Sequence, residues 1–135
     1  MRNTLTDLLK KHEGRRLKPY VCTAGKLTIG FGRNLDDVGI SIDEAEFMLD
    51  NDIKRTLAEC RSNFTWFNGL SENRQAVVAS MVFNMGLARF KVFARTIAHI
   101  EAGYYEDAAR EMLDSKWASQ VGHRAVELAQ LMREG

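Results

Sequence analysis

The segment between Lys18 and Leu35 limits what this chain can fold into more than any other, because it cannot be helical. Its sequence reads KPYVCTAGKLTIGFGRNL. Pro19 lacks a backbone N–H group and is excluded from a helix interior. β-branched and aromatic residues, which favour strands, alternate here with glycines, which favour turns. We therefore expect a small antiparallel sheet of at most three short strands, with a turn near residues 23–26.

The rest of the chain carries helical patterns, so the sheet would be a minor part of a mostly helical α+β fold. Apolar residues at helical spacing, with polar caps before them and glycines after them, mark the helices. The expected helices are residues 4–12, a long helix from about 42 to 61 that begins at the Ser41–Glu44 capping box, a helix over 72–85 between Ser71 and Gly86, and three shorter ones over about 93–102, 105–115 and 122–133. The centre of the helix over 72–85 is apolar on nearly every side and should be buried.

The length of 135 residues corresponds to one domain. Because the strand signals precede most of the helices, we expect a single two-lobed domain. The N-terminal lobe should span about residues 12–55 and carry the sheet, and the helix of about 42–61 should connect it to a helical C-terminal lobe of about 62–135. The first helix should pack on the C-terminal lobe.

Composition and charge exclude several classes of protein. Two cysteines are too few for a disulfide framework, and Cys60 is expected in the core together with Trp117. The N-terminus is charged throughout, which argues against a signal peptide, and no window approaches the ~20 apolar residues of a membrane span. The three histidines, His12, His99 and His123, have no metal-ligand spacing, so no metal or other cofactor is expected.

The near-neutral net charge hides two opposite segments. Residues 1–35 contain eight basic and two acidic side chains, a net charge of +6, whereas residues 36–60 contain two basic and eight acidic ones, a net charge of −6. A basic segment beside a cleft suits an anionic substrate, although most such side chains simply form solvated faces. The interleaving of aromatic and basic residues that is typical of nucleic-acid-binding modules is missing, so no nucleic-acid partner is expected.

Glu13 is the first candidate for chemistry. It lies at the expected end of the first helix, where the negative pole of the helix dipole disfavours ionisation. A protonated carboxyl group is what a glycosidase needs to protonate a leaving oxygen. Judged by position alone, an ordinary surface residue at a helix end is the better interpretation of Glu13.

The spacing from Glu13 onwards resembles the phage lysozyme (endolysin) family, muramidases of the T-even phage lysozyme type. The shared residues are Glu13-Gly14, Leu17-Lys18, Tyr20, Gly25, Thr28-Ile29-Gly30 and Gly32. Further matches cover most of the chain and lie at residues 42–46, 81–86, 108–109, 115–117, 120 and 124–125. The resemblance implies a lysozyme-like two-lobed fold, with a small antiparallel sheet in one lobe and helices in the other.

The resemblance also implies an activity, namely hydrolysis of the β-1,4 bond between N-acetylmuramic acid and N-acetylglucosamine in peptidoglycan. It makes Glu13 the general acid and Thr28 the hydroxyl that positions the attacking water. The family has an aspartate where this chain has Cys22. A thiol there could act as a base or as a nucleophile once ionised, or it could be a packed bystander.

Further roles follow from the resemblance alone. Asn34, Phe83 and Thr96 fall at or near sugar-contact positions, although Phe83 could instead pack in the core. Tyr20 and Arg124 would support the site, with Arg124 approaching the acid across the cleft. Arg33 stands where the family has a histidine.

Other activities stay open on the sequence. A lytic transglycosylase needs one acid and no second carboxylate, and it releases an anhydro-sugar. A thiol-dependent hydrolase of the peptide stems could use Cys22 with a histidine such as His12. A wall-binding module without activity is the remaining alternative.

The resemblance also sets the expected partners. They are the glycan strands of peptidoglycan, bound by a monomer that does not insert stably into membranes. The enzyme would wait in the host bacterial cytoplasm until a separate holin opens the membrane.

Overall fold

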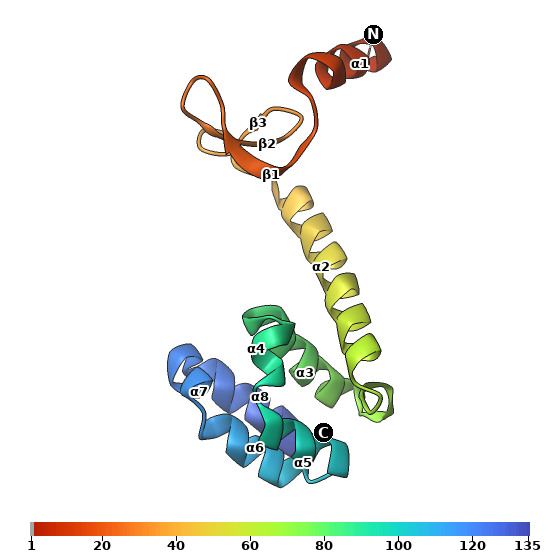
Figure 1. The fold of residues 1–135 in the computed structure, drawn as a ribbon, viewed down its shortest axis with the longest axis vertical. Helices are drawn as coiled ribbons and strands as arrows, with labels where there is room; N and C mark the ends of the chain where they lie inside the picture. The colour runs from red at the N-terminus through yellow and green to blue at the C-terminus, as the bar shows by residue number, and fades with distance from the viewer. Residues whose placement is uncertain (1) are drawn as a thin grey trace. The chain divides into compact units, whose positions relative to one another are not determined.

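A computed structural model describes residues 2–135 (Figure 1). The chain divides into two compact units between Met48 and Leu49, inside the long helix α2 (Ile42–Asn63). The expectation of a mostly helical α+β chain with a small antiparallel sheet is confirmed. The packing of the first helix on the C-terminal lobe would be a contact between the two units and stays a prediction.

The N-terminal unit begins with helix α1 (Arg2–Glu13). Leu5, Leu8 and Leu9 share one face of this helix and are 45–47% exposed. The helix ends as expected at Gly14, whose N–H group donates to the Lys10 carbonyl at 3.2 Å. The φ angle of Gly14 is +74°, a left-handed conformation that glycine adopts without steric cost.

A three-stranded antiparallel sheet follows in the order β1 (Arg16–Val21), β2 (Leu27–Gly30) and β3 (Arg33–Asn34). Arg16 pairs with Gly30 and Tyr20 pairs with Thr28, so three residues of β1 stand opposite Ile29 alone. This bulge contains Pro19, which has no N–H group to give to the ladder. The expected turn over residues 23–26 joins β1 to β2.

Helix α2 starts at the expected capping box. The Ser41 hydroxyl accepts from the Glu44 N–H group at 3.1 Å, and the Glu44 carboxylate accepts from the Ser41 N–H group at 2.9 Å. Among residues 2–48, Thr28 is the only buried side chain, with 3% of its surface exposed. Hydrogen bonds and ion pairs, rather than an apolar core, therefore hold this part of the unit in place.

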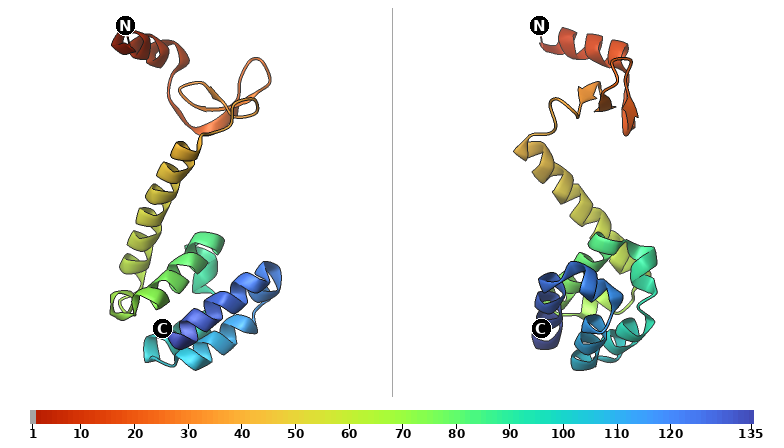
Figure 2. Two further views of the ribbon diagram at one scale, coloured as in Figure 1. Left: turned by 180° about the vertical axis from the view of Figure 1, so that it is seen from behind. Right: turned by 90° about the vertical axis from the view of Figure 1, so that its left-hand side faces the viewer.

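The C-terminal unit is helical. Its elements after α2 are the 3-10 turn η1 (Phe67–Gly69) and the helices α3 (Glu72–Met85), α4 (Leu87–Lys91), α5 (Ala94–Ala102), α6 (Tyr105–Leu113), α7 (Lys116–Val121) and α8 (His123–Glu134). Helix α6 packs on α5 and α8, and α8 also packs on α3 and α7 (Figure 2). The sequence analysis missed α4 and α7, because helices of five and six residues are too short to show a period.

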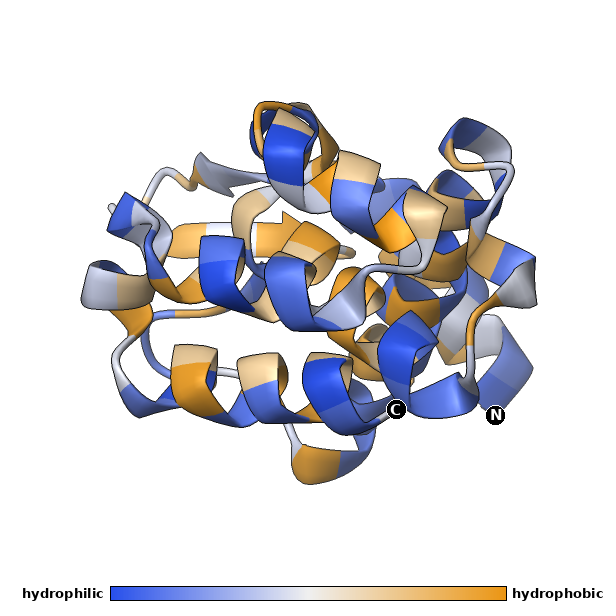
Figure 3. Cartoon of the chain, turned by 90° about the horizontal axis from the view of Figure 1, so that it is seen from below, coloured by the Kyte–Doolittle hydropathy of each residue, from blue (hydrophilic) through white to orange (hydrophobic). Residues whose placement is uncertain are grey.

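The core of the chain lies in this unit. Helix α3 buries Val77, Val78, Met81 and Val82 near its centre, as expected, while Phe83 is exposed. The expected core positions of Cys60, 0% exposed, and of Trp117, 6% exposed, are confirmed. Colouring by hydropathy shows hydrophilic and hydrophobic residues mixed along individual helices (Figure 3). No helix within residues 2–135 has the length and apolar character needed to cross a membrane.

Candidate active site

Glu13 is the last residue of α1, and its side chain reaches the turn between β2 and β3. The carboxyl group lies directly against the backbone of Gly32. A Cβ atom placed on Gly32 would stand 2.8 Å from Glu13 Oε2, closer than real Cβ contacts allow. The exposed acid is therefore held against a fixed point of the sheet.

Cys22 lies at the other end of β1, where the chain turns into β2. Its N–H group donates to the Lys26 carbonyl at 2.9 Å, and its carbonyl accepts from the Gly25 N–H group at 2.9 Å. These two bonds close a tight turn that brings the Cys22 side chain next to Thr28. The thiol is half-buried and forms no disulfide.

The surroundings of Cys22 favour its ionised form. Hydrogen bonds from the Lys26 and Ala24 backbone N–H groups, followed by one from the Thr28 hydroxyl, lower the pKa of Cys22 and outweigh the opposing effect of burial. By contrast, burial raises the pKa of Cys60 to about 11. The two free cysteines therefore differ in their tendency to ionise, because their surroundings favour the thiolate at Cys22 and the neutral thiol at Cys60.

Thr28 is buried beneath this turn. Its hydroxyl donates to the Lys26 carbonyl at 2.9 Å, and its lone pairs remain free to accept further hydrogen bonds. A hydroxyl has one proton, so it can serve the Lys26 carbonyl while Cys22 is a thiol and can rotate to the sulfur once Cys22 is ionised. Tyr20 faces Thr28 across the sheet, and the Arg16 guanidinium lies 4.5 Å from the centre of its ring.

The Asn34 side chain forms two hydrogen bonds with Asp37 in the loop after β3. Its amide oxygen accepts from the Asp37 N–H group at 3.0 Å, and its amide nitrogen donates to the Asp37 carboxylate at 3.0 Å. The Asp37 carboxylate also forms an ion pair with Lys26 at 3.1 Å. Asn34 thus shapes this loop, and one amide hydrogen and one lone pair of the amide oxygen remain for a ligand.

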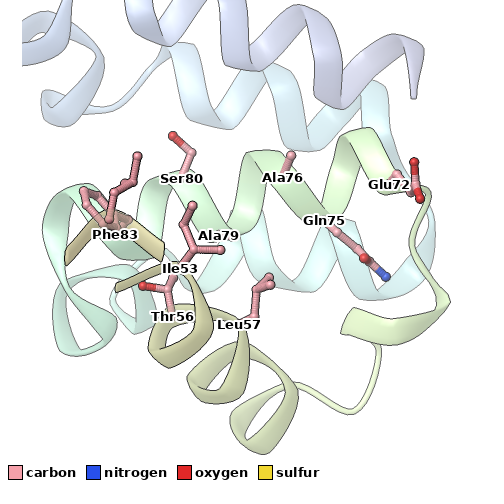
Figure 4. Close-up of a pocket in the computed structure, with 10 residues that line it drawn as sticks. Ile53, Thr56, Leu57, Glu72, Gln75, Ala76, Ala79, Ser80 and Phe83 are labelled. Carbon is pink, nitrogen blue, oxygen red and sulfur yellow. The ribbon is translucent and has the colours of Figure 1, made fainter. Parts of the chain in front are cut away.

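The other expected site residues lie in the C-terminal unit. Phe83 is 47% exposed and lies at the end of an apolar groove of about 460 Å3 between α2 and α3 (Figure 4). Thr96 on α5 is only 3% exposed, so little of its hydroxyl can reach a sugar in this conformation. Arg124 on α8 is exposed and donates to the Ser80 hydroxyl at 3.1 Å. The roles of these three residues stay predictions.

Two features of the site were missed from the sequence. Gly32 was expected as a turn residue shared with the family, but its contact with Glu13 was not foreseen. Arg33 was noted for replacing a histidine, but its two-pronged ion pair with Glu44, at 2.8 and 2.7 Å, was not foreseen. Neither contact has a signal in sequence spacing, because each joins the end of a helix to a distant part of the sheet. Within residues 2–135, no group of three or more acidic, histidine or cysteine side chains is arranged to hold a metal ion.

Comparison with known proteins identifies the class. The profile of the phage lysozyme family matches residues 10–133. An endolysin of Acyrthosiphon pisum secondary endosymbiont phage 1 is 33% identical over 82% of this chain and 75% of its own length. "Probable T4-type lysozyme 2" of Dictyostelium discoideum is 27% identical over 100% of this chain and 96% of its own length. The pre-baseplate central spike protein Gp5 of Enterobacteria phage T4 is 24% identical over 98% of this chain but only 28% of its own length.

The chain therefore belongs to the phage lysozyme family. It is accordingly a glycoside hydrolase, a muramidase that acts on bacterial peptidoglycan.

Proposed function

We propose that this lysozyme hydrolyses the β-1,4 bond between N-acetylmuramic acid and N-acetylglucosamine, with Glu13 as general acid and with Cys22 and Thr28 on the side of the attacking water. The observation that carries the assignment is the turn around Cys22. Hydrogen bonds from backbone N–H groups of this turn and from the Thr28 hydroxyl lower the pKa of Cys22 and so favour a thiolate. This turn belongs to the sheet whose other end holds Glu13.

In the proposed reaction, the protonated Glu13 carboxyl gives its proton to the bridging oxygen as the bond to the anomeric carbon breaks. A water molecule attacks that carbon. The Thr28 hydroxyl accepts a hydrogen bond from the water, and the Cys22 thiolate takes its proton. The products are two shorter glycan strands, a Glu13 carboxylate and a Cys22 thiol. Proton transfer from the thiol through solvent to Glu13 restores the starting state.

The acid assignment is tested by Glu13→Gln, which removes the transferable proton and keeps the size of the side chain. We expect a loss of about 100-fold or more in the rate of peptidoglycan clearing and of reducing-end release. Asp7→Asn is the matched control, because it neutralises an exposed carboxyl group on the same helix. Wild-type clearing by Glu13→Gln would refute the assignment.

The role of Cys22 is tested by three changes. As a base, Cys22 should tolerate replacement by aspartate, which is also a base, and Cys22→Asp should therefore stay active. Cys22→Ala and alkylation of the thiol should both suppress clearing. If the alanine variant and the alkylated enzyme both cleared at the wild-type rate, Cys22 would be a bystander. A covalent glycosyl adduct on Cys22, trapped and seen by mass spectrometry, would make it a nucleophile instead.

Three side chains are proposed to contact the sugar. Phe83 offers an exposed ring face against which a sugar can lie, and Asn34 offers its remaining amide hydrogen. Thr96 is the third proposed contact. Tyr20 would support the site from beside Thr28, and Arg124 from α8. Phe83→Ala should raise KM for glycan oligomers more than it lowers kcat, because stacking on a ring is binding energy.

A lytic transglycosylase is the second candidate, and one feature favours it. Glu13 is the only carboxyl group between positions 13 and 28, and a transglycosylase needs no second carboxylate. Its product carries an anhydro ring and is lighter than the hydrolysed one by one water. Mass spectrometry of the released muropeptides therefore separates the two reactions.

Cleavage of the peptide stems by Cys22 is less well supported. The groups that lower the pKa of the Cys22 thiol are backbone N–H groups and the Thr28 hydroxyl, none of which is a base. A thiol hydrolase needs a base within hydrogen-bond reach of the sulfur. Release of amino groups without new reducing ends would favour the peptidase over the glycosidase.

For delivery, we propose that the enzyme waits in the host cytoplasm and reaches the wall through a lesion made by a separate holin. Support comes from the endolysin among its relatives. Cells that express the enzyme alone should stay intact and should lyse when a permeabilising agent is added. Lysis without that agent would contradict the proposal.

A further inference from the structure

We propose that Gly32 is a positioning residue for the catalytic acid, because the space left by its missing side chain seats the Glu13 carboxyl group. The inference rests on the proposed function, since the seat matters for catalysis only where Glu13 is the acid. It adds a residue that contributes through its backbone alone.

The contact singles out Gly32 among the glycines of the N-terminal unit. A Cβ atom at Gly32 would lie 2.8 Å from Glu13 Oε2, 3.1 Å from Cδ and 3.2 Å from Cγ. The same atom placed on Gly14, Gly25, Gly30 or Gly39 would meet nothing within 4 Å. Any side chain at position 32 must therefore displace the carboxyl group, whereas side chains at the other positions would point into open space.

The seat is fixed by the residue that follows it. Arg33 pairs with Ile29 in the sheet, and its guanidinium holds the Glu44 carboxylate at 2.8 and 2.7 Å. The same guanidinium donates to the Gly39 carbonyl at 3.1 Å. Glu44 is itself held by the backbone of Ser41 at the start of α2. The turn beneath Glu13 is thus tied to both the sheet and α2, and the turn cannot easily yield to an added side chain.

A seat of this kind serves general acid catalysis. The acid must lie within about 3 Å of the bridging oxygen in a productive complex. A carboxyl group on an exposed helix end would otherwise sample many rotamers. A misplacement of about 1 Å at a reacting group can cost about 100-fold in rate. Holding the carboxyl against the Gly32 backbone removes part of that freedom before the substrate binds.

The test compares Gly32→Ala with Gly30→Ala. Both glycines have positive φ, +80° for Gly32 and +71° for Gly30, so both variants carry the same type of backbone strain, two residues apart where β2 ends. Only Gly32→Ala also pushes on the Glu13 carboxyl. We expect Gly32→Ala to lower kcat by about 100-fold with little change in KM. Gly30→Ala should keep most of its kcat. Equal losses in the two variants would overturn the inference.

A double-mutant cycle with Glu13→Asp supplies a second measurement. The shorter aspartate withdraws the carboxyl group from the seat, so Gly32→Ala should cost much less in the Glu13→Asp background than in the wild type. Independent, multiplicative losses would contradict the inference. Circular dichroism of each variant shows that it is folded.

A readout that needs no activity separates the seat from the proposed function. In amide NMR spectra, Glu13→Gln should shift the Gly32 signal clearly more than the Gly30 signal. Equal shifts would overturn the seat even where Glu13→Gln abolishes clearing. Conversely, full clearing by Glu13→Gln would refute the acid role and, with it, the catalytic importance of the seat, whatever the Gly32 signal does.

Discussion

Arg74 joins three helices of the C-terminal unit through a single guanidinium group, and we expect its replacement to destabilise that unit. From α3 its Nε donates to the Met132 carbonyl at 2.8 Å, and Nη2 donates to the Arg133 carbonyl at 3.1 Å. Both carbonyls belong to the last turn of α8, where intrahelical partners are lacking. The guanidinium also lies 3.6 Å from the centre of the Tyr105 ring of α6.

The size of the effect follows from these contacts. Two charge-assisted hydrogen bonds in a half-exposed setting contribute about 1–1.5 kcal/mol each. The stacking on Tyr105 adds about 0.5–1 kcal/mol. Arg74→Met should therefore lower the free energy of unfolding by about 3 kcal/mol. In a chain of this size that corresponds to a fall of about 10 °C in Tm. Arg74→Lys keeps the charge but loses the planar fork, and it should fall between the wild type and Arg74→Met.

Thermal unfolding followed by tryptophan fluorescence measures this effect selectively, because both tryptophans, Trp66 and Trp117, lie in the C-terminal unit. Arg133→Met is the matched control. Its side chain forms an exposed ion pair with Glu106 at 3.2 Å, which should contribute less than about 1 kcal/mol. If Arg74→Met lowered Tm no more than Arg133→Met, the guanidinium contacts would not hold the helices together as argued.

Three further predictions concern titration and thiol chemistry. The Arg33 guanidinium lowers the pKa of Glu44 to about 2. The ion pair therefore stabilises the fold fully above pH ~4.3, the pKa of an unperturbed glutamate, and this contribution is lost as the pH falls toward 2. Glu44→Gln should therefore reduce stability at pH 7 and flatten its dependence on pH between 4.3 and 2, as measured by chemical denaturation; an unchanged acid profile would rule out the pair as its source. In native protein, a thiol reagent should modify Cys22 readily and Cys60 only after unfolding; two reactive thiols in the native state would contradict the burial of Cys60. Because a thiolate base is lost as the pH falls, Cys22→Asp should extend activity to lower pH, by less than the ~4.6 units that separate free cysteine from free aspartate; identical pH profiles would count against Cys22 as the base.

Local patterns in the sequence were sufficient for most of the secondary structure. Gly14 and Ser41 end and begin helices as expected, because caps act on their immediate neighbours. Pro19 and the glycines after it indicated the sheet for the same reason. The bulge in β1 was not foreseen, because a register shift depends on the partner strand. Helices α4 and α7 were missed because so few residues carry no readable period.

The features of the candidate site also fall into those that the sequence predicts and those that only the structure shows. By itself, the sequence determined the family and the residue types at positions 13, 22 and 28, because these follow from identity and spacing along the chain. Only the tertiary structure decided that the Glu13 carboxyl contacts Gly32, that hydrogen bonds lower the pKa of Cys22, and that Arg33 forms an ion pair with Glu44. These contacts join the end of a helix to the sheet or close a turn, so they depend on how the elements are placed in space. Their effects on pKa and position depend on distances of a few ångströms, which spacing in a sequence does not encode.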